Sequence, residues 1–170
     1  AVRYADMPEK DIEIVGIPSY DVYVKQKPTG KEEFFRKLGL DPGKRVIVFC
    51  PLGKRYSDMD NEILDLIYDY QKGGAFLADT QILVRFPPND FVDNDKIKKK
   101  NGLVFYQPGT RFTTSEERRV DWDMKDEDIQ VLLDTLKYAD LLVCQASTMS
   151  IDAAVWDVPI INFQISSETG

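Results

Sequence analysis

The sequence predicts a doubly wound α/β domain built around a parallel sheet. Residues 45–50, RVIVFC, form an almost unbroken run of β-branched and aromatic side chains, which is typical of a strand buried on both faces. Further apolar runs alternate with helical patterns over about 125 residues, and parallel strands require such crossover connections. The 170-residue chain is long enough for one domain with a substantial core, but not for two.

The N-terminal part contributes two predicted elements. A short apolar alternation at Ile12–Val15, closed by Gly16 and Pro18, predicts a strand that leads into the domain and ends in a turn. A polar linker follows, and helical spacing then predicts a helix over residues 31–38 that Gly39 ends. We therefore expect residues 1–30 to be a leading strand and linker, and residues 31–165 to form the core.

The core contains five predicted strands separated by helices. The strands are expected at Arg45–Cys50, Gln81–Phe86, Leu103–Tyr106, Leu141–Cys144 and Ile160–Phe163. Apolar residues at helical spacing predict helices at about 63–70, 126–139 and 148–156. The helix over 126–139 has the clearest pattern, because it has one apolar stripe and three acidic residues at its positive end.

Composition excludes several classes of function. A formal net charge of −7 and a pI near 4.7 argue against nucleic-acid binding, which depends on dense Lys and Arg. No apolar stretch approaches the length of a membrane-spanning helix, and no signal peptide is visible. Cys50 and Cys144 lie in apolar runs and are interpreted as buried, reduced thiols of a cytoplasmic protein. The chain has no histidine, so carboxylates must carry any acid/base chemistry.

The loop after the first core strand is a candidate anion site. It reads PLGKRYSD and places Gly53, Lys54 and Arg55 just before a helix. Backbone N–H groups at a helix start together with two cations can hold a phosphate. An ordinary loop with solvated cations explains the same residues equally well.

The loop after the fourth strand, QASTMSID, has the strongest local signal. Ser147, Thr148 and Met149 stand at a predicted helix start, where hydroxyl and N–H groups can meet a phosphate or diphosphate. Asp152 lies one turn further on, where a carboxylate could accept hydrogen bonds from a ribose diol. The alternative is that Ser147 is only an N-cap and Asp152 only stabilises the helix dipole.

Two further positions complete the set of candidates. The stretch that follows the third strand could line a base pocket through Tyr106, Gln107 and Phe112. Arg85, near the end of the second strand, is either a phosphate-side cation or a surface ion-pair partner, and we favour the ion pair.

These motifs together resemble the donor domain of glycosyltransferases with the GT-B fold. The resemblance rests on STMSIDAAVWDVPIINF after a helix ending in YADLLV, on the opening IEIVGIPSYDVY, and on KEEFFRKLGLDPGKRVIVF. QILVRFPPND is similar to a strand that carries a His-Pro pair in many relatives, with Phe86 in place of the histidine. The resemblance covers about residues 12–163 and implies a Rossmann-like, three-layer α/β/α domain, one half of a two-domain enzyme.

The resemblance also implies a function. A nucleoside-diphosphate sugar, or a related donor such as CDP-glycerol, would bind with its phosphates near Ser147 and Thr148 and its ribose near Asp152. The Gly53 loop would face the diphosphate from the other side. Such enzymes transfer the donor group to a glycan or lipid-linked acceptor and usually need no metal or cofactor. Asp121-Trp122-Asp123 matches the Asp-x-Asp pattern of metal-binding sites, but we interpret it as a helix cap.

In GT-B enzymes the acceptor site and the catalytic base come mainly from an N-terminal domain, which this chain lacks. The chain is therefore expected to be the donor-binding fragment of a cytoplasmic enzyme of polysaccharide biosynthesis, inactive alone. Peripheral contact of the full-length enzyme with the inner membrane face stays open. Two other interpretations remain: an enzyme similar to UDP-sugar 2-epimerases, and a non-catalytic α/β binding or scaffold module.

Overall fold

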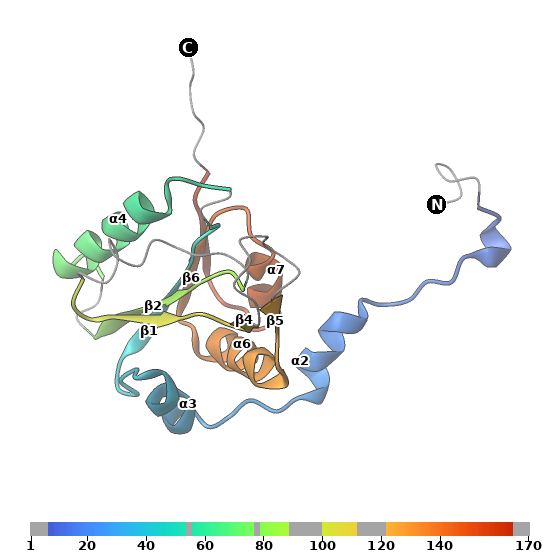
Figure 1. The fold of residues 1–170 in the computed structure, drawn as a ribbon, viewed down its shortest axis with the longest axis horizontal. Coiled ribbons are helices and arrows are strands. Elements are labelled where there is room, and N and C mark those ends of the chain that lie inside the picture. Colours follow the sequence, from blue (N-terminus) through green and yellow to red (C-terminus); the bar gives the residue numbers. More distant parts are fainter. Residues whose placement is uncertain (1–6, 54–55, 77–78, 89–99, 112–121, 165–170) are drawn as a thin grey trace, which may run out of the picture.

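The expected parallel sheet is present. The computed structural model describes residues 7–53, 56–76, 79–88, 100–111 and 122–164. Five parallel strands form a sheet in the order β3-β2-β1-β6-β7 (Figure 1). Their bounds are β1 Arg45–Cys50, β2 Thr80–Arg85, β3 Leu103–Tyr106, β6 Leu141–Cys144 and β7 Ile160–Asn162. The doubly wound α/β prediction is therefore confirmed, and each strand lies within one residue of its predicted bounds.

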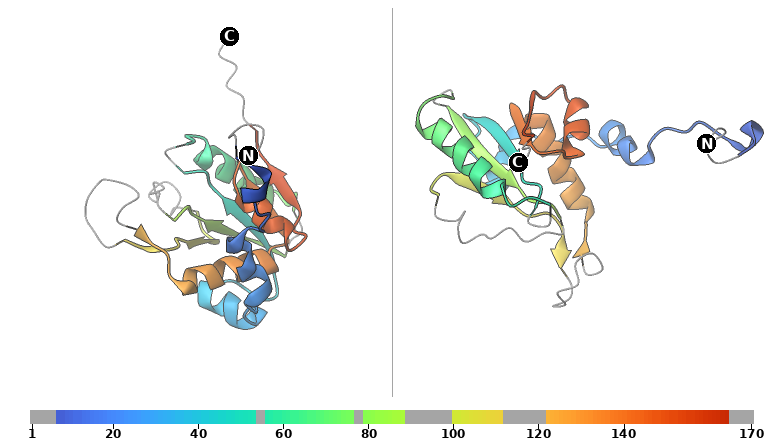
Figure 2. Two further views of the ribbon diagram at one scale, coloured as in Figure 1. Left: turned by 90° about the vertical axis from the view of Figure 1, so that its right-hand side faces the viewer. Right: turned by 90° about the horizontal axis from the view of Figure 1, so that it is seen from above.

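Side chains of the central strand β1 alternate between two apolar clusters. Val46 and Val48 pack on one face with residues of α3 and α6, whereas Ile47 and Phe49 pack on the other face with residues of α4. Both faces of the sheet are covered by helices, as the two views in Figure 2 show. The result is a three-layer α/β/α core, because a strand buried on both faces needs an apolar layer on each side.

The helices agree closely with the sequence pattern. The core helices are α3 Lys31–Leu38, α4 Asp60–Lys72, α6 Asp126–Tyr138 and the short α7 Met149–Ala154. Helix α3 ends as predicted at Gly39, whose φ of 77° lies in the left-handed region that favours glycine. Helix α6 starts where the N–H of Lys125 donates to the Asp128 carboxylate at 3.0 Å.

The Asp121-Trp122-Asp123 sequence is not the helix cap that we expected. Asp121 lies outside the described residues, and Trp122–Asp123 forms the short strand β5, which pairs antiparallel with β4 at Thr110–Arg111. The first turn of α6 is instead capped from within by Asp128.

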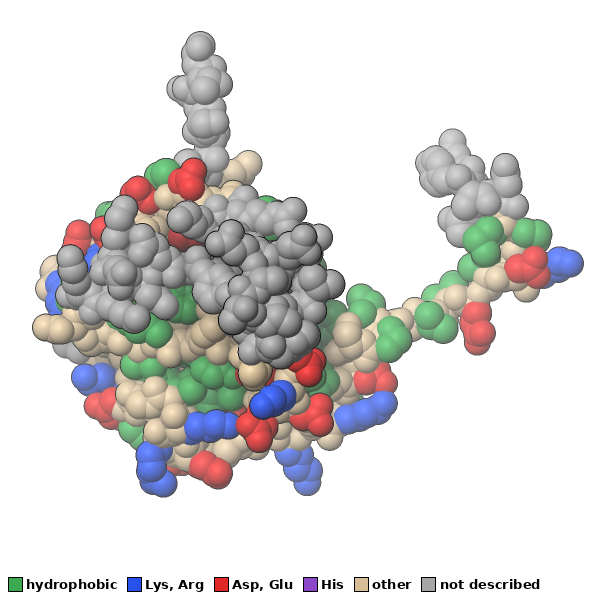
Figure 3. All heavy atoms as spheres, in the orientation of Figure 1, with side chains coloured by type: hydrophobic (Ala, Val, Ile, Leu, Met, Phe, Trp, Pro, Cys, Tyr) green, Lys and Arg blue, Asp and Glu red, His purple; other side chains and the backbone are tan. Residues whose placement is uncertain are grey.

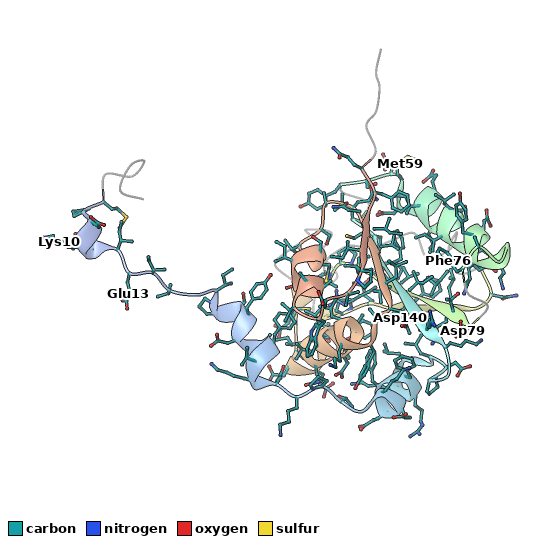
Figure 4. All side chains as sticks on the ribbon, turned by 180° about the vertical axis from the view of Figure 1, so that it is seen from behind. Lys10, Glu13, Met59, Phe76, Asp79 and Asp140 are labelled. Carbon is teal, nitrogen blue, oxygen red and sulfur yellow. The ribbon has the colours of Figure 1, made fainter. Side chains whose placement is uncertain are left out.

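The prediction of a strand at Ile12–Val15 is wrong. Two short 3-10 helices, η1 Glu9–Asp11 and η2 Pro18–Tyr20, flank an extended segment, and helix α2 Asp21–Lys25 follows. Ile14 is 97% exposed, and no described strand pairs with this segment. Figure 4 shows Lys10 and Glu13 on a segment that leads away from the body. The alternation of apolar and polar residues matches that of a strand. A strand also needs a neighbouring strand to share its backbone hydrogen bonds, and this segment has none among the described residues.

Candidate functional site

The carboxyl ends of β1, β2 and β6 meet around a cavity of about 210 Å³, which we call the edge cavity. Its walls are the end of β1 with the turn Pro51–Leu52, residues 85–88 at the end of β2, and residues 147–149 after β6. Figure 4 shows the two ends of the sheet: Asp79 and Asp140 precede β2 and β6, and Met59 lies far from them beside the start of α4. The turns carrying Gly53 and Ser147 therefore lie on the same rim, where ligands of open α/β sheets bind.

Among the residues that the structure describes, Arg85 is the only arginine or lysine that lines this cavity. Its side chain is only 6% exposed, its Nε has no hydrogen-bond partner, and its Nη1 lies 3.9 Å from Met149 Sδ. Within the described residues no carboxylate forms a salt bridge with it. The prediction that Arg85 lies on the surface is therefore wrong, because its side chain is buried at the strand end, and the ion-pair partner that we favoured is not found among the described residues.

A buried guanidinium without a counter-charge among the described residues is unfavourable in the absence of a ligand. Moving a cation out of water without a counter-charge costs several kcal/mol (of order 3–5). The charge of Arg85 also opposes the effect of burial on nearby groups: burial raises the pKa of Cys50 to about 12, and Arg85 acts to lower it. The edge cavity is thus locally positive in an acidic protein.

The turn after β6 is built by local hydrogen bonds. Ala146 adopts a φ of 32°, which is uncommon for a residue with a side chain, and its N–H donates to Asn162 Oδ1 at 3.1 Å. Ser147 Oγ accepts the N–H of Met149 at 3.2 Å, while Thr148 occupies the N-cap position. Ser147 therefore makes a local contact at the helix start, but the N-cap position that the alternative interpretation gave it belongs to Thr148. The Thr148 side chain stays exposed on the rim.

The turn after β1 is held by a buried carboxylate. Asp60, at the start of α4, accepts the N–H groups of Leu52 and Gly53 at 2.9 and 2.8 Å, and Gln145 Nε2 at 2.9 Å. Gly53 N–H therefore already has an acceptor within the chain, so a phosphate would have to contact another group of this turn. Lys54 and Arg55 lie outside the described residues. The sequence did not single out Asp60 or Gln145.

A second, larger cavity of about 610 Å³ adjoins the turn after β6, and we call it the tyrosine cavity. Tyr20 and Tyr23 line it from η2 and α2, and Thr148 and Asp152 line it from the start of α7. Desolvation, followed by the negative charge of Asp152, raises the pKa of both tyrosines. Thr148 also lines the edge cavity, so the two cavities share one residue.

The residues predicted for a base pocket lie elsewhere. The Tyr106 hydroxyl donates to Asp128 at 2.7 Å, and Gln107 Nε2 donates to the Pro87 carbonyl at 2.6 Å. Neither residue lines the edge cavity or the tyrosine cavity. Phe112 lies outside the described residues. Sequence analysis missed the two tyrosines, although their spacing of three residues beside Pro18 would place them on one side of a short helix.

Two findings bear on metals and membranes. Across the described ranges, no group of three or more His, Cys, Asp or Glu side chains is placed to hold a metal ion. None of the helices in those ranges combines the length and apolarity needed to cross a bilayer. The expectations of metal-free chemistry and of a cytoplasmic location stay predictions.

A comparison with protein families identifies the chain. Residues 3–169 match the family described as CDP-glycerol:poly(glycerophosphate) glycerophosphotransferase. The chain belongs to this family. This is a family of transferases. The predicted resemblance to GT-B donor domains is confirmed, and the family is the one described by CDP-glycerol. A search of curated proteins finds no match.

Solved structures support the fold. The chain aligns with a variant of the wall teichoic acid polymerase TagF soaked with CDPG at 21% identity and a TM-score of 0.54, covering 92% of this chain and 33% of that one. A protein from Listeria monocytogenes assigned as a UDP-N-acetylglucosamine 2-epimerase aligns at 11% identity and a TM-score of 0.55, covering 88% of this chain and 34% of that one. At these identities the likeness shows the fold alone. The chain spans about a third of the length of both proteins.

Proposed function

We propose that this chain binds the CDP-glycerol donor of a glycerophosphotransferase, with the donor diphosphate in the edge cavity. The observation that carries the proposal is Arg85, a buried cation with an unpaired Nε at the carboxyl edge of the sheet. A diphosphate would supply the missing counter-charge, and arginine holds phosphate oxygens through paired N–H groups. The family description names CDP-glycerol, so the donor we propose is this one and not a nucleotide sugar.

The reaction that fits this donor is a phosphoryl transfer. A hydroxyl oxygen at the end of the poly(glycerophosphate) chain attacks the phosphorus of the glycerol phosphate. The bond from that phosphorus to the bridging oxygen breaks, CMP leaves with the bridging oxygen, and the hydroxyl proton passes to a base. Arg85 would stabilise the negative charge that develops on the CMP phosphate, and the Thr148 hydroxyl on the rim would donate to a phosphate oxygen.

The acceptor site and the base are proposed to lie outside this chain. The chain has no histidine, and it spans about a third of the matched structures. We therefore propose that residues 1–170 act as the donor-binding half, and that a further domain brings the acceptor hydroxyl to the edge cavity. In this scheme the chain alone binds the donor but does not extend the polymer.

Isothermal titration calorimetry with CDP-glycerol tests the proposal. The Arg85→Gln variant should bind about 10- to 100-fold more weakly, because it loses charge-assisted hydrogen bonds to the diphosphate. Arg36→Gln, on the exposed side of α3, is the matched control and should bind like the parent. In the absence of ligand, Arg85→Gln should melt no lower than the parent, because it removes an unpaired buried charge.

Two outcomes would contradict the proposal. One is the absence of saturable heat when CDP-glycerol is added to the folded parent chain, which would favour the scaffold interpretation. The other is equal affinity of the parent and Arg85→Gln for CDP-glycerol. Stronger binding of UDP-N-acetylglucosamine than of CDP-glycerol would instead favour the epimerase-like alternative.

A further inference from the structure

A third cavity lies at the amino ends of the strands, on the rim opposite the edge cavity, and we call it the amino-edge cavity. It has a volume of about 730 Å³, and its walls come from residues 39–44, 71–74, 80–81 and 102–104. These are the loop that joins α3 to β1, the end of α4, and the starts of β2 and β3. Figure 4 labels Asp79, the residue before β2, on this side of the sheet. The reaction proposed above does not use this space.

Hydrogen bonds between its walls make the amino-edge cavity a preformed site. Gln81 is only 7% exposed, and its side chain accepts the N–H of Asp41 at 2.9 Å and donates to the Asp41 carbonyl at 2.8 Å. This pair fixes the loop before β1 against β2. Gln71 Nε2 donates to the Thr80 carbonyl at 2.8 Å and fixes the end of α4 against the same strand.

The charges around this cavity favour an anion. Its charged lining residues, among those that the structure describes, are Lys44, Lys72 and Asp41. Lys44 Nζ lies 3.9 Å from Asp41 Oδ2, and both side chains are about half exposed, so this ion pair contributes little. Lys72 forms no salt bridge with any described carboxylate, and its Nζ lies 5.3 Å from the centroid of the Tyr68 ring. Two cations of an acidic chain therefore meet at one cavity with weak carboxylate partners.

The polar groups beside these lysines favour a ligand that also carries hydroxyl groups. Thr80 Oγ1 is shielded from solvent and has no hydrogen-bond partner among the described residues, which is unfavourable for a hydroxyl. The Asp41 carboxylate accepts the Gly43 N–H through Oδ1 at 2.9 Å, and its Oδ2 has only the distant lysine. A ligand hydroxyl would give both groups a hydrogen bond.

We propose that the amino-edge cavity binds glycerol phosphate units, with a phosphate held by Lys44 and Lys72 and a hydroxyl held by Asp41 and Thr80. The leucine and valine at the start of β3 would contact the carbon atoms. None of the described lining residues is aromatic, so the cavity offers no stacking surface for a nucleobase, and CDP-glycerol is not expected here. Its volume falls in the upper part of the range of small-molecule sites, which leaves room for consecutive units.

The same unit occurs in free glycerol phosphate and in poly(glycerophosphate). We assign the polymer as the source, because the cavity has room for more than one unit, and only this choice rests on the proposed function. A polymer bound at this rim would stay attached to the enzyme between successive transfers at the edge cavity.

NMR titration of the ¹⁵N-labelled chain locates the ligand and measures its affinity. The probes are glycerol 3-phosphate, a glycerophosphate trimer joined by phosphodiester bonds, and inorganic phosphate. The two glycerol-containing probes should shift amides of residues 39–44, 71–74 and 80–81 in a saturable way. The trimer should bind about tenfold more tightly than glycerol 3-phosphate, because further units occupy the cavity.

Variants test the assigned contacts. The double variant Lys44→Gln/Lys72→Gln should bind the trimer about tenfold more weakly, whereas Lys37→Gln, on the exposed side of α3, should bind like the parent. Thr80→Val should weaken trimer binding about threefold or more without lowering the melting temperature, because it removes a hydroxyl that has no described partner. Arg85→Gln should leave trimer binding unchanged, and the double lysine variant should bind CDP-glycerol like the parent.

Four outcomes would overturn the inference or part of it. Trimer-induced shifts confined to residues 51–53 and 147–149 would place the polymer in the edge cavity instead. Inorganic phosphate binding as tightly as glycerol 3-phosphate would show that the hydroxyl contacts are wrong. Glycerol 3-phosphate binding at least as tightly as the trimer would show that the polymer is the wrong source. If none of the probes gives saturable shifts, the amino-edge site is wrong, while the CDP-glycerol titration still decides the proposed function by itself.

Discussion

The Asp60 carboxylate links the two turns that form the edge cavity, and its removal gives the sharpest prediction for stability. Asp60 is 6% exposed and accepts N–H groups from Leu52, Gly53 and Gln145 at 2.8–2.9 Å. Asp60→Ala leaves these three donors without this acceptor in a place that water reaches poorly. It also removes an acidic residue from the first turn of α4, where a negative charge is favourable.

The size of the effect follows from these contacts. Each donor left unsatisfied costs about 1–3 kcal/mol, and neighbouring contributions are not fully additive, so a loss of about 3–5 kcal/mol is expected. A domain of this size is stable by about 5–15 kcal/mol, so the variant should remain folded but unfold at much lower urea. The free energy of unfolding is measured from urea titrations followed by circular dichroism.

The matched control is Asp69→Ala, an exposed aspartate near the end of the same helix. It should change the free energy of unfolding by less than about 0.5 kcal/mol. The reasoning is refuted if Asp60→Ala costs less than about 1 kcal/mol, or if the two variants are equally destabilised. Asp60→Ala should also weaken CDP-glycerol binding, because Asp60 and Gln145 set the spacing between the turns after β1 and β6.

Two further predictions concern titratable groups. Burial alone would raise the pKa of Asp128, but hydrogen bonds from Gly109 N–H, Lys125 N–H and the Tyr106 hydroxyl hold it below its usual value. Asp128→Asn should therefore lower the urea midpoint near pH 7, and the difference from the parent should shrink as the pH falls below about 4 through the depressed pKa; a difference that grows in acid would contradict this. Cys50 and Cys144 are both buried free thiols, and burial raises the pKa of each, so Ellman's reagent at pH 8 should modify the native protein far more slowly than the urea-unfolded protein. Equal rates would show that the thiols are accessible.

The strands and helices of the core could be predicted because their signals are local. The run at Arg45–Cys50 is apolar at almost every position, and only a strand with helices on both faces can bury such a segment. Helix α6 shows an apolar stripe and acidic residues in its first turn, and both are properties of the helix itself. The segment Ile12–Val15 has an equally local signal, but without a neighbouring strand the same pattern stays extended and exposed.

The candidate site was only half predictable, because its parts are far apart in the chain. The positions of Ser147 and Thr148 at a strand end follow from the pattern and from the rule that ligands bind at the carboxyl edge. The inward orientation of Arg85 does not, since the side-chain environment depends on which turns converge over β2. Figure 3 shows hydrophobic side chains on the N-terminal segment. The sequence contains these residues, but it does not predict the path that the segment takes.

What the sequence by itself determined is the order of elements, the parallel sheet, the rim that carries the site and the family resemblance. These follow from side-chain periodicity and from motifs that lie within a few consecutive residues. Only the tertiary structure decided that Tyr20 and Tyr23 face Asp152, that Asp60 already holds the Gly53 turn, and that Arg85 is buried without a described counter-charge. Each of these three features depends on residues from different elements. Whether such residues meet, and how deeply they are buried, is not encoded by any local pattern.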